Sequence, residues 1–327
     1  MKRRDFLSTS LLTAAAALAP LTGLIPFAVL AEAAEPVTEL RIGYQKNGVL
    51  LVAKEQGLLE KRLASRGITI KWAEFPFGPP LLEALNAGRL DYGTTGDAPP
   101  IFAQAARANL VYAAAIAGRG AGQAIVVPPD SPIKTVADLR GKKVGVAKAS
   151  SAHNLLIAAL EADGIGFNEV QALYLAPADA AAAYAKGAID AWSIWDPFYA
   201  IAELSGRGAR ALPLKPEALA QNSFFLANRA FATAHPDIVV AVNEELTRAT
   251  EWINTHRDEA AVQFAEATGV DLAAQKKTVN RADFVFAPLS EAVITQQQAV
   301  ADRFFKLGLI PKQITVRDIV WTAKTAA

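Results

Sequence analysis

The sequence predicts a two-lobed α/β fold in which each lobe contains a mixed β-sheet flanked by helices. Three observations support this fold class. Strand-like and helix-like patterns of apolar residues alternate along the chain, as they do in α/β proteins. A strand-to-helix motif occurs twice in the same sequence. The chain has 327 residues, of which 52% are hydrophobic, and this length favours two domains with sizeable cores.

The first part of the chain supplies the elements of one lobe in a regular order. Pro79 opens a helix and Gly88 follows its end, which are the preferred places of these two residues. Around this helix we expect strands at residues 40–44, 68–74 and 90–93, and further helices at residues 49–65 and 98–108. Gly57 is expected to break the first of these helices and Gly67 to end it. Helices dominate the last part of the chain, at residues 236–256, 259–268 and 290–307.

An internal repeat indicates that the two lobes are built alike. Residues 41–46 (RIGYQK) recur as residues 143–148 (KVGVAK), each time as a strand that leads into a helix. A glycine and two aspartates follow each copy in the same order, at Gly88, Asp91 and Asp97 and at Gly187, Asp190 and Asp196. Chance, or the general sequence pattern of α/β folds, is the alternative explanation. We predict lobe 1 from residues 37–122 and 223–327, lobe 2 from residues 123–222, and two crossover strands that form a hinge.

The first 33 residues have the pattern of an export signal. Lys2, Arg3 and Arg4 precede an apolar stretch at residues 11–30, which ends in a small-residue pattern at residues 31–33. Residues 3–7 (RRDFL) resemble a twin-arginine signal. We therefore expect a soluble protein in the periplasm. An uncleaved membrane anchor is the alternative, and the prolines within the apolar stretch argue against it.

Composition excludes several classes of protein. The 33 basic and 32 acidic residues nearly balance, so no nucleic-acid partner is expected. The chain contains no cysteine, which excludes disulfides, a thiolate nucleophile and a lipoprotein anchor. The three histidines lack the spacing of metal ligands, and no phosphate-binding or nucleophile-elbow motif is present. We expect no metal, no cofactor and no catalytic residue.

Four strand-to-helix turns are expected to line a cleft, two from each lobe. Ligands of open α/β sheets bind at the carboxyl ends of the strands, beside the helices that follow. The turns lie at residues 45–48, 94–99, 149–154 and 192–197.

The turns at residues 94–99 and 149–154 are candidate anion sites. Ser150 and Ser151 stand at the start of a helix, where free N–H groups and the helix dipole attract an anion. The alternative is that these serines only cap the helix. In the other turn, Thr94 and Thr95 likewise supply hydroxyl groups before a helix, and Gly96 allows a ligand to come close to the backbone.

Other residues in these regions allow two interpretations each. Asp97 either caps a helix or binds an amine of the ligand, and Asp196 allows the same two roles. His153 is either structural or in contact with the ligand, and Arg281 is either solvated or bound to the ligand. Trp192 lies either in the core or, with Trp195, in an aromatic wall of the cleft. We take all of them as candidate site residues.

Seven segments of the chain resemble the aliphatic sulfonate-binding proteins of ABC transporters, most strongly in the first lobe and at the four turns. They are residues 40–46 (LRIGYQK), 82–86 (LEALN), 95–97 (TGD), 99–105 (PPIFAQA), 150–156 (SSAHNLL), 174–180 (YLAPADA) and 190–197 (DAWSIWDP). The resemblance covers nearly the whole chain after the signal. It implies a type II periplasmic-binding-protein fold and a monomer that delivers alkanesulfonates to a membrane permease as a source of sulfur. It also implies that the sulfonate contacts Gln45, Thr95, Gly96, Ser150, Ser151, His153 and Asn154, with Trp192 and Asp196 nearby.

Two alternatives to this function remain. The ligand of such a binding protein can also be taurine, nitrate or a pyrimidine precursor of thiamine. An enzyme of thiamine-pyrimidine biosynthesis shares the fold family, but the resemblance implies that its chemistry needs cysteines, which this chain lacks.

Overall fold

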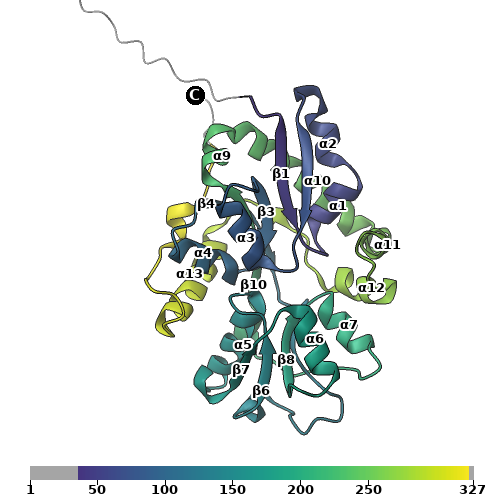
Figure 1. Cartoon of the computed structure of the whole chain (residues 1–327), viewed down its shortest axis with the longest axis vertical. Helices are drawn as coiled ribbons and strands as arrows, with labels where there is room; N and C mark the ends of the chain where they lie inside the picture. Colours follow the sequence, from purple (N-terminus) through teal and green to yellow (C-terminus); the bar gives the residue numbers. More distant parts are fainter. Residues whose placement is uncertain (1–35, 324–327) are drawn as a thin grey trace, which may run out of the picture. The chain divides into compact units, whose positions relative to one another are not determined.

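The computed structural model describes residues 36–323, and the predicted export signal lies outside the described residues (Figure 1). Six strands form the first sheet, in the order β11-β4-β10-β3-β1-β2. The strands β1, β2 and β3 are parallel, whereas β10 is antiparallel to both of its neighbours, and β11 is antiparallel to β4. Their bounds are β1 Glu39–Tyr44, β2 Thr69–Glu74, β3 Tyr92–Thr95, β4 Leu110–Gly118, β10 Gln221–Asn228 and β11 Phe286–Ala287.

Five strands form the second sheet, in the order β7-β6-β8-β5-β9. The strands β6, β7 and β8 are parallel, and β5 is antiparallel to β8 and β9. Their bounds are β5 Gln123–Val127, β6 Lys143–Val146, β7 Gln171–Tyr174, β8 Ala191–Trp195 and β9 Arg210–Ala211. We call the parts built on the six-stranded and five-stranded sheets the first and second lobe.

Helices cover both faces of each sheet and bury an apolar core on each side. In the first lobe one face carries α1 Val49–Glu55, α2 Leu58–Leu63, α9 Arg229–Ala234, α10 Pro236–Thr255, α11 Arg257–Thr268 and α12 Leu272–Arg281. The opposite face carries α3 Gly78–Asn86, α4 Ala98–Ala105 and α13 Glu291–Lys306. In the second lobe α5 Ser151–Ala162 and α8 Pro216–Leu219 lie on one face, and α6 Pro177–Ala185 and α7 Phe198–Leu204 on the other. The predicted fold class is confirmed.

The internal repeat is visible as matching hydrogen bonds in the two sheets. The carboxylate of Asp91 accepts from the backbone N–H of Arg41 at 2.8 Å, and that of Asp190 accepts from the N–H of Lys143 at 2.8 Å. This contact joins β1 to the parallel strand β3 in the first lobe, and β6 to the parallel strand β8 in the second. The aspartates shared by the two copies therefore fix the start of equivalent strands.

The glycines of the two motifs are also equivalent. A Cβ atom on Gly43 would lie 2.6 Å from the side chain of Leu90, and one on Gly145 would lie 2.6 Å from that of Ile189. Each glycine lets the apolar residue before the shared aspartate pack directly on the strand. The repeat thus extends to side-chain packing.

The chain passes between the sheets twice. Residues 119–122 connect β4 to β5, and the segment that contains α8 leads from β9 into β10. The helix expected at residues 49–65 is divided into α1 and α2 at Gly57, as predicted, because Gly57 adopts a left-handed conformation with φ of 58°. The short strand β11 was not predicted.

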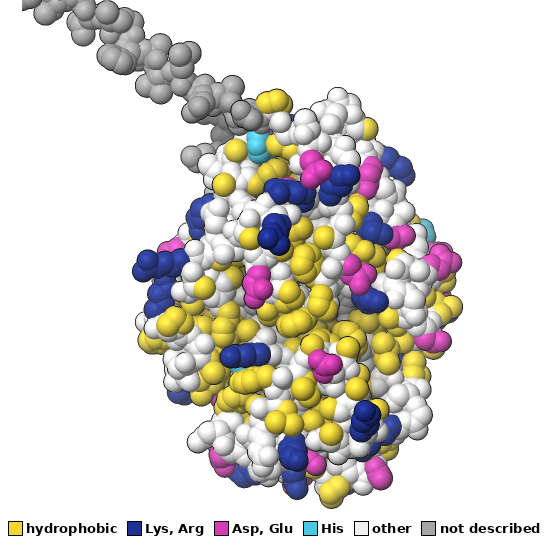
Figure 2. All heavy atoms as spheres, in the orientation of Figure 1, with side chains coloured by type: hydrophobic (Ala, Val, Ile, Leu, Met, Phe, Trp, Pro, Cys, Tyr) yellow, Lys and Arg dark blue, Asp and Glu magenta, His cyan; other side chains and the backbone are white. Residues whose placement is uncertain are grey.

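Charged side chains of both signs are interspersed on the face shown in Figure 2. Among residues 36–323, no helix has both the length and the apolar character needed to cross a membrane. Within the same residues, no three His, Cys, Asp or Glu side chains lie close enough together to hold a metal ion.

Candidate ligand-binding site

A cavity of about 180 Å³ lies between the two lobes, and each of the four predicted turns contributes to its wall. The contributions are Gln45, Asn47 and Gly48; Thr94, Thr95 and Gly96; Ser150 and Ser151; and Trp195 and Asp196. The carboxyl ends of the strands in both sheets therefore meet at one site, as expected for α/β folds.

The N-terminus of α5 is the part of this wall best suited to an anion. Ser150 is the N-cap, and its hydroxyl accepts from the N–H of His153 at 3.4 Å and donates to the carbonyl of Ala147 at 2.6 Å. Ser151 is the first residue of the helix and lines the cavity. The first N–H groups of a helix have no acceptor within it and carry the positive end of its dipole, so they can bind an anion.

The N-terminus of α4 is less suited to an anion than its sequence suggests. Its N–H groups are few, because Pro99 and Pro100 have none and that of Ala98 donates to the carboxylate of Asp97 at 2.7 Å. Asp97 is therefore an N-cap. Thr94 and Thr95 bring hydroxyls to the cavity, but both hydroxyls donate to backbone carbonyls.

Asp97 and Asn154 lie behind the cavity wall and join the lobes. The side-chain amide of Asn154 donates to Asp97 at 2.7 Å, and the guanidinium of Arg303 donates to Asn154 at 2.8 Å. Burial raises the pKa of Asp97 to about 7, although the hydrogen bonds from Asn154 and Ala98 lower it. These residues line a second cavity of about 110 Å³ and not the first.

His153 supports the turn before α5 from within the core. It is fully buried against Phe167 and Phe304, and its Nδ1 atom accepts from the N–H of Ala149 at 3.3 Å. Ala149 has a φ of 60°, a conformation that alanine rarely adopts, and this hydrogen bond helps to hold it. Burial, with the charge of Lys148, lowers the pKa of His153 to about 4, so the ring is neutral at pH 7.

The two tryptophans of β8 have different positions. Trp192 is 2% exposed and packs against Tyr184 in the core, outside the cavity wall. Trp195 lines the cavity. Residues three apart in a strand point to opposite faces, so the two side chains are on different sides of the sheet.

Arg281 lines the cavity but its charge is already paired. Its guanidinium contacts Asp196 at 3.3 Å and Glu203, both on the second lobe, and lies 4.0 Å from the ring centroid of Tyr199. Burial raises the pKa of Asp196 to about 6, although Arg281 lowers it. Arg281 is the last residue of α12, and it connects the lobes at one edge of the cavity.

Asn47 adds another contact between the lobes. Its side-chain amide donates to the backbone carbonyl of Asp196 at 2.7 Å. Gln45, on the same turn, donates to the carbonyl of Thr94 at 3.1 Å. The first turn therefore touches both lobes in this structure.

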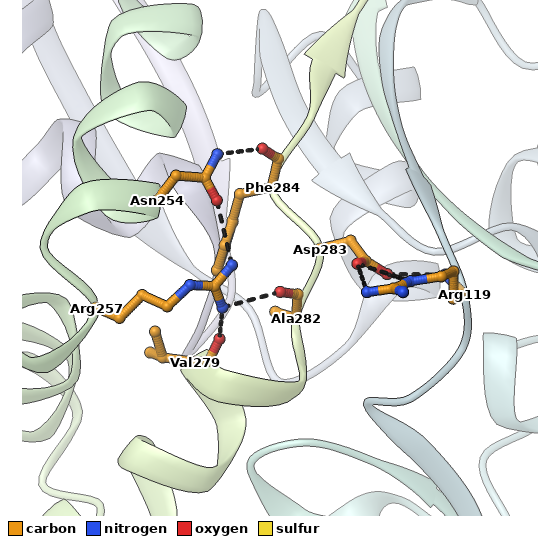
Figure 3. A network of polar contacts seen from close by, with 7 residues as sticks. All are labelled: Arg119, Asn254, Arg257, Val279, Ala282, Asp283 and Phe284. Carbon is orange, nitrogen blue, oxygen red and sulfur yellow. Dashed lines mark hydrogen bonds and ion pairs between the residues drawn. The ribbon is translucent and has the colours of Figure 1, made fainter.

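The segment at residues 282–284 forms a wall of the cavity that sequence reasoning missed (Figure 3). Arg257 donates to the carbonyl of Ala282 at 3.2 Å, and Asn254 donates to that of Phe284 at 2.6 Å. Asp283, between them, pairs with Arg119 at 2.8 Å. This segment has no counterpart in the internal repeat, so the repeat gave no signal for it.

Strand β10 supplies further lining residues that were not predicted. Gln221, Ser223 and Phe225 line the cavity, whereas Asn222 lines the second cavity. This alternation follows from the two-residue period of a strand. This alternation could be expected from the sequence, but the sequence does not show which face of the strand lines the cavity.

The chain was compared with known proteins. The family model described as NMT1/THI5 like matches residues 48–260. A protein of Escherichia coli (strain K12), named as an aliphatic sulfonates-binding protein, is 41% identical over 92% of this chain and 94% of its own length. The structure of the alkanesulfonate-binding protein SsuA from Xanthomonas axonopodis pv. citri, bound to MOPS, matches with a TM-score of 0.81 and 42% identity over 87% of this chain and 98% of that one.

A second solved structure agrees with the first. It is the periplasmic aliphatic sulphonate binding protein SsuA from Escherichia coli, with a TM-score of 0.80 and 40% identity over 89% of this chain and 94% of that one. The relatives with this level of identity are binding proteins. The fold, the family model and the identity together show that the chain belongs to the NMT1/THI5-like family and, within it, to the aliphatic sulfonate-binding proteins.

Proposed function

We propose that this protein captures aliphatic sulfonates in the periplasm and delivers them to the permease of an ABC transporter for sulfur acquisition. The observation that carries this proposal is the cavity between the lobes, where the start of α5 faces turns from the other lobe. A sulfonate is a compact anion with several acceptor oxygens, which suits the free N–H groups of a helix start. The names of the full-length relatives support the same ligand class.

The proposal assigns contacts to residues that line the cavity. Ser151 and the N–H groups at the start of α5 bind the sulfonate, while Ser150 holds the helix start in place. The remaining polar contacts come from Gln45, Thr94, Thr95 and Gly96. His153, Asn154 and Asp97 act from behind the wall by positioning these residues, whereas Trp192 packs in the core of the second lobe.

The tail of the ligand lies against the apolar part of the cavity. Ile116, Phe225, Phe264 and Phe284 supply apolar surface, and Trp195 adds an aromatic ring. Arg281 is paired with carboxylates of the second lobe, and we assign it to closing the cleft rather than to binding the sulfonate.

The proposal includes the organisation and location of the molecule. It takes residues 37–122 with 223–327 as one lobe and residues 123–222 as the other, a division supported by the membership of the two sheets. It takes residues 1–33 as a twin-arginine-like signal and the exported protein as a monomer. The pattern at residues 2–33 and the periplasmic relatives support the export.

Calorimetric titration of the protein with a panel of anions tests the function. We expect butanesulfonate and hexanesulfonate to bind and to raise the melting temperature, because they bind only the native state. At a hundredfold excess over Kd the gain is about 2.7 kcal/mol. Pentanoate, which has a carboxylate in place of the sulfonate, serves as the matched control and is expected to bind at least tenfold more weakly.

The same panel contains the ligands of the alternative functions. Taurine, nitrate and a thiamine-precursor pyrimidine are titrated under the same conditions. Binding of one of these at least tenfold tighter than any alkanesulfonate would replace the proposed ligand. Absence of heat and of thermal stabilisation with every sulfonate would reject the proposal.

A further inference from the structure

The hinge segment between β4 and β5 leaves an unusually bare stretch of cavity wall. Its sequence is GRGAG, at residues 118–122, and four of its residues line the cavity: Gly118, Gly120, Ala121 and Gly122. A methyl group is the largest side chain among these four. The three glycines therefore need an explanation, which is either backbone packing or the ligand.

Packing of the hinge explains two of the glycines. A Cβ atom on Gly118 would lie 2.7 Å from the carbonyl oxygen of Gln221, and one on Gly120 would lie 2.1 Å from that of Leu219. Both distances are shorter than any real Cβ contact, and the atoms that would be struck belong to the backbone. Gly120 also has a φ of 73°, which favours glycine. These two residues allow the two hinge crossings to lie side by side.

Gly122 has neither reason to be glycine. Its φ lies outside the left-handed region, and the nearest atom to an added Cβ is the Oδ2 atom of Asp196, at 3.7 Å. That is an ordinary van der Waals distance. The backbone hydrogen bond at this position, from the N–H of Asp196 to the carbonyl of Gly122 at 2.8 Å, does not depend on the side chain. The protein's own structure therefore tolerates a Cβ atom here.

The missing side chain at position 122 leaves space inside the cavity. Gly122 and Asp196 both line it, and an added Cβ would be in van der Waals contact with the Asp196 carboxylate. Ile116 and Phe225 add apolar surface to the same cavity. Larger residues at position 122 would take volume from this cavity of about 180 Å³.

We propose that Gly122 determines the size of the sulfonate tail that this cavity accepts. This inference rests on the proposed function, because it assigns the space beside Gly122 to the tail of a sulfonate whose anionic group lies at α5. Each methylene group that enters apolar surroundings gains free energy from leaving water. A side chain that fills the space removes this gain for a long tail and leaves a short ligand unaffected.

The test compares Gly122→Leu with the parent, using hexanesulfonate and ethanesulfonate in calorimetric titrations. We expect the Kd of hexanesulfonate to rise at least tenfold and that of ethanesulfonate to stay within about twofold. Gly122→Ala changes the cavity by one methyl group, and we expect a rise of about threefold for hexanesulfonate only. The smaller variant keeps the test valid if the leucine variant does not fold.

Gly206→Leu is the matched control. Gly206 also lacks a positive φ and has no atom within 4 Å of an added Cβ, but it lies in an exposed loop after α7 and does not line the cavity. We expect this variant to bind both sulfonates like the parent.

The outcomes separate the inference from the proposed function. Unchanged binding of hexanesulfonate by a folded Gly122→Leu protein overturns the inference, and so does an equal loss for the two sulfonates. A parent protein that binds neither sulfonate rejects the proposed function instead.

Discussion

Asp97 is an N-cap residue whose burial also raises the pKa of its carboxyl group. Its carboxylate is 1% exposed, accepts from Ala98 on its own lobe and from Asn154 on the other, and has Arg303 as the nearest charged group in its hydrogen-bond network. Burial raises its pKa to about 7, whereas the ordinary value is 3.8. Between these values the folded protein holds a proton that the unfolded chain has released.

This difference predicts how stability changes with pH. A raised pKa in the folded state gives a contribution that is complete below about pH 4 and is lost as the pH rises through about 7. We expect the free energy of unfolding of the parent to fall with pH relative to that of Asp97→Asn, by at most about 1.4 kcal/mol per pH unit. Urea denaturation at about pH 5, 6 and 7 measures it. Asp130→Asn, in an exposed loop, is the control, and a parent-to-variant difference that does not change with pH would contradict the prediction.

Sequence reasoning identified the turns at the residue scale but not every side chain that faces the ligand. His153 lies two residues beyond Ser151 on a helix, which is about 200° around the axis, so only one of them can face the cavity. Trp192 and Trp195 are three residues apart in a strand, so their side chains point to opposite faces of the sheet and only one of them can face the cavity. The sequence does not show which face meets the core until the neighbouring elements are placed.

Elements were predicted best where the repeat or a breaker residue marked them. The strands that contain the motif, β1 and β6, are present in both lobes, and Asp91 and Asp190 join them to the parallel strands β3 and β8. The cavity wall at residues 282–284 escaped prediction because it is a short irregular segment. Its position depends on hydrogen bonds from Arg257 and Asn254, on other helices, which no local pattern indicates.

The two serines at the start of α5 have different roles, so their substitution should have two distinct effects. The hydroxyl of Ser150 is used within the turn, so Ser150→Ala should lower the free energy of unfolding by about 1 kcal/mol through loss of the cap. Ser151 faces the cavity, so Ser151→Ala should leave stability unchanged. The variant should bind butanesulfonate about tenfold to a hundredfold more weakly, since a hydrogen bond to a charged group is lost.

Urea denaturation and calorimetric titration of both variants measure these two effects. Gln221 lines the same cavity from β10 but is not part of the helix start, so Gln221→Ala shows how much any polar lining residue contributes. Parent-like affinity of a folded Ser151→Ala protein would remove α5 from the anion site.

At the scale of the whole molecule, the lobes meet where Gly96 lies against Ser151. A Cβ atom on Gly96 would lie 2.8 Å from the Cβ of Ser151 and 2.9 Å from its hydroxyl oxygen. Real Cβ atoms do not come this close, and the Cβ of Ser151 is fixed to the backbone of α5. The arrangement of the lobes in this structure therefore requires glycine at position 96 as long as position 151 has a side chain.

This contact predicts a variant that folds but does not close. Gly96→Ala should keep the stability of the parent, because its φ lies outside the left-handed region and the clash is between lobes. Its affinity for butanesulfonate should fall at least tenfold, since closure then costs free energy that the ligand must supply. Small-angle scattering should show that saturating ligand compacts the parent and not the variant.

A second substitution distinguishes a steric clash from other effects of Gly96→Ala. Ser151→Gly removes the atoms that the new methyl group meets, so the double variant should close and bind within about threefold of Ser151→Gly alone. Gly206→Ala, in open space outside the cavity wall, controls for the general effect of replacing a glycine. A loss of binding free energy in the double variant equal to the sum of the losses in the two single variants would mean that the two substitutions act independently. That result would contradict a contact between the lobes through these two residues.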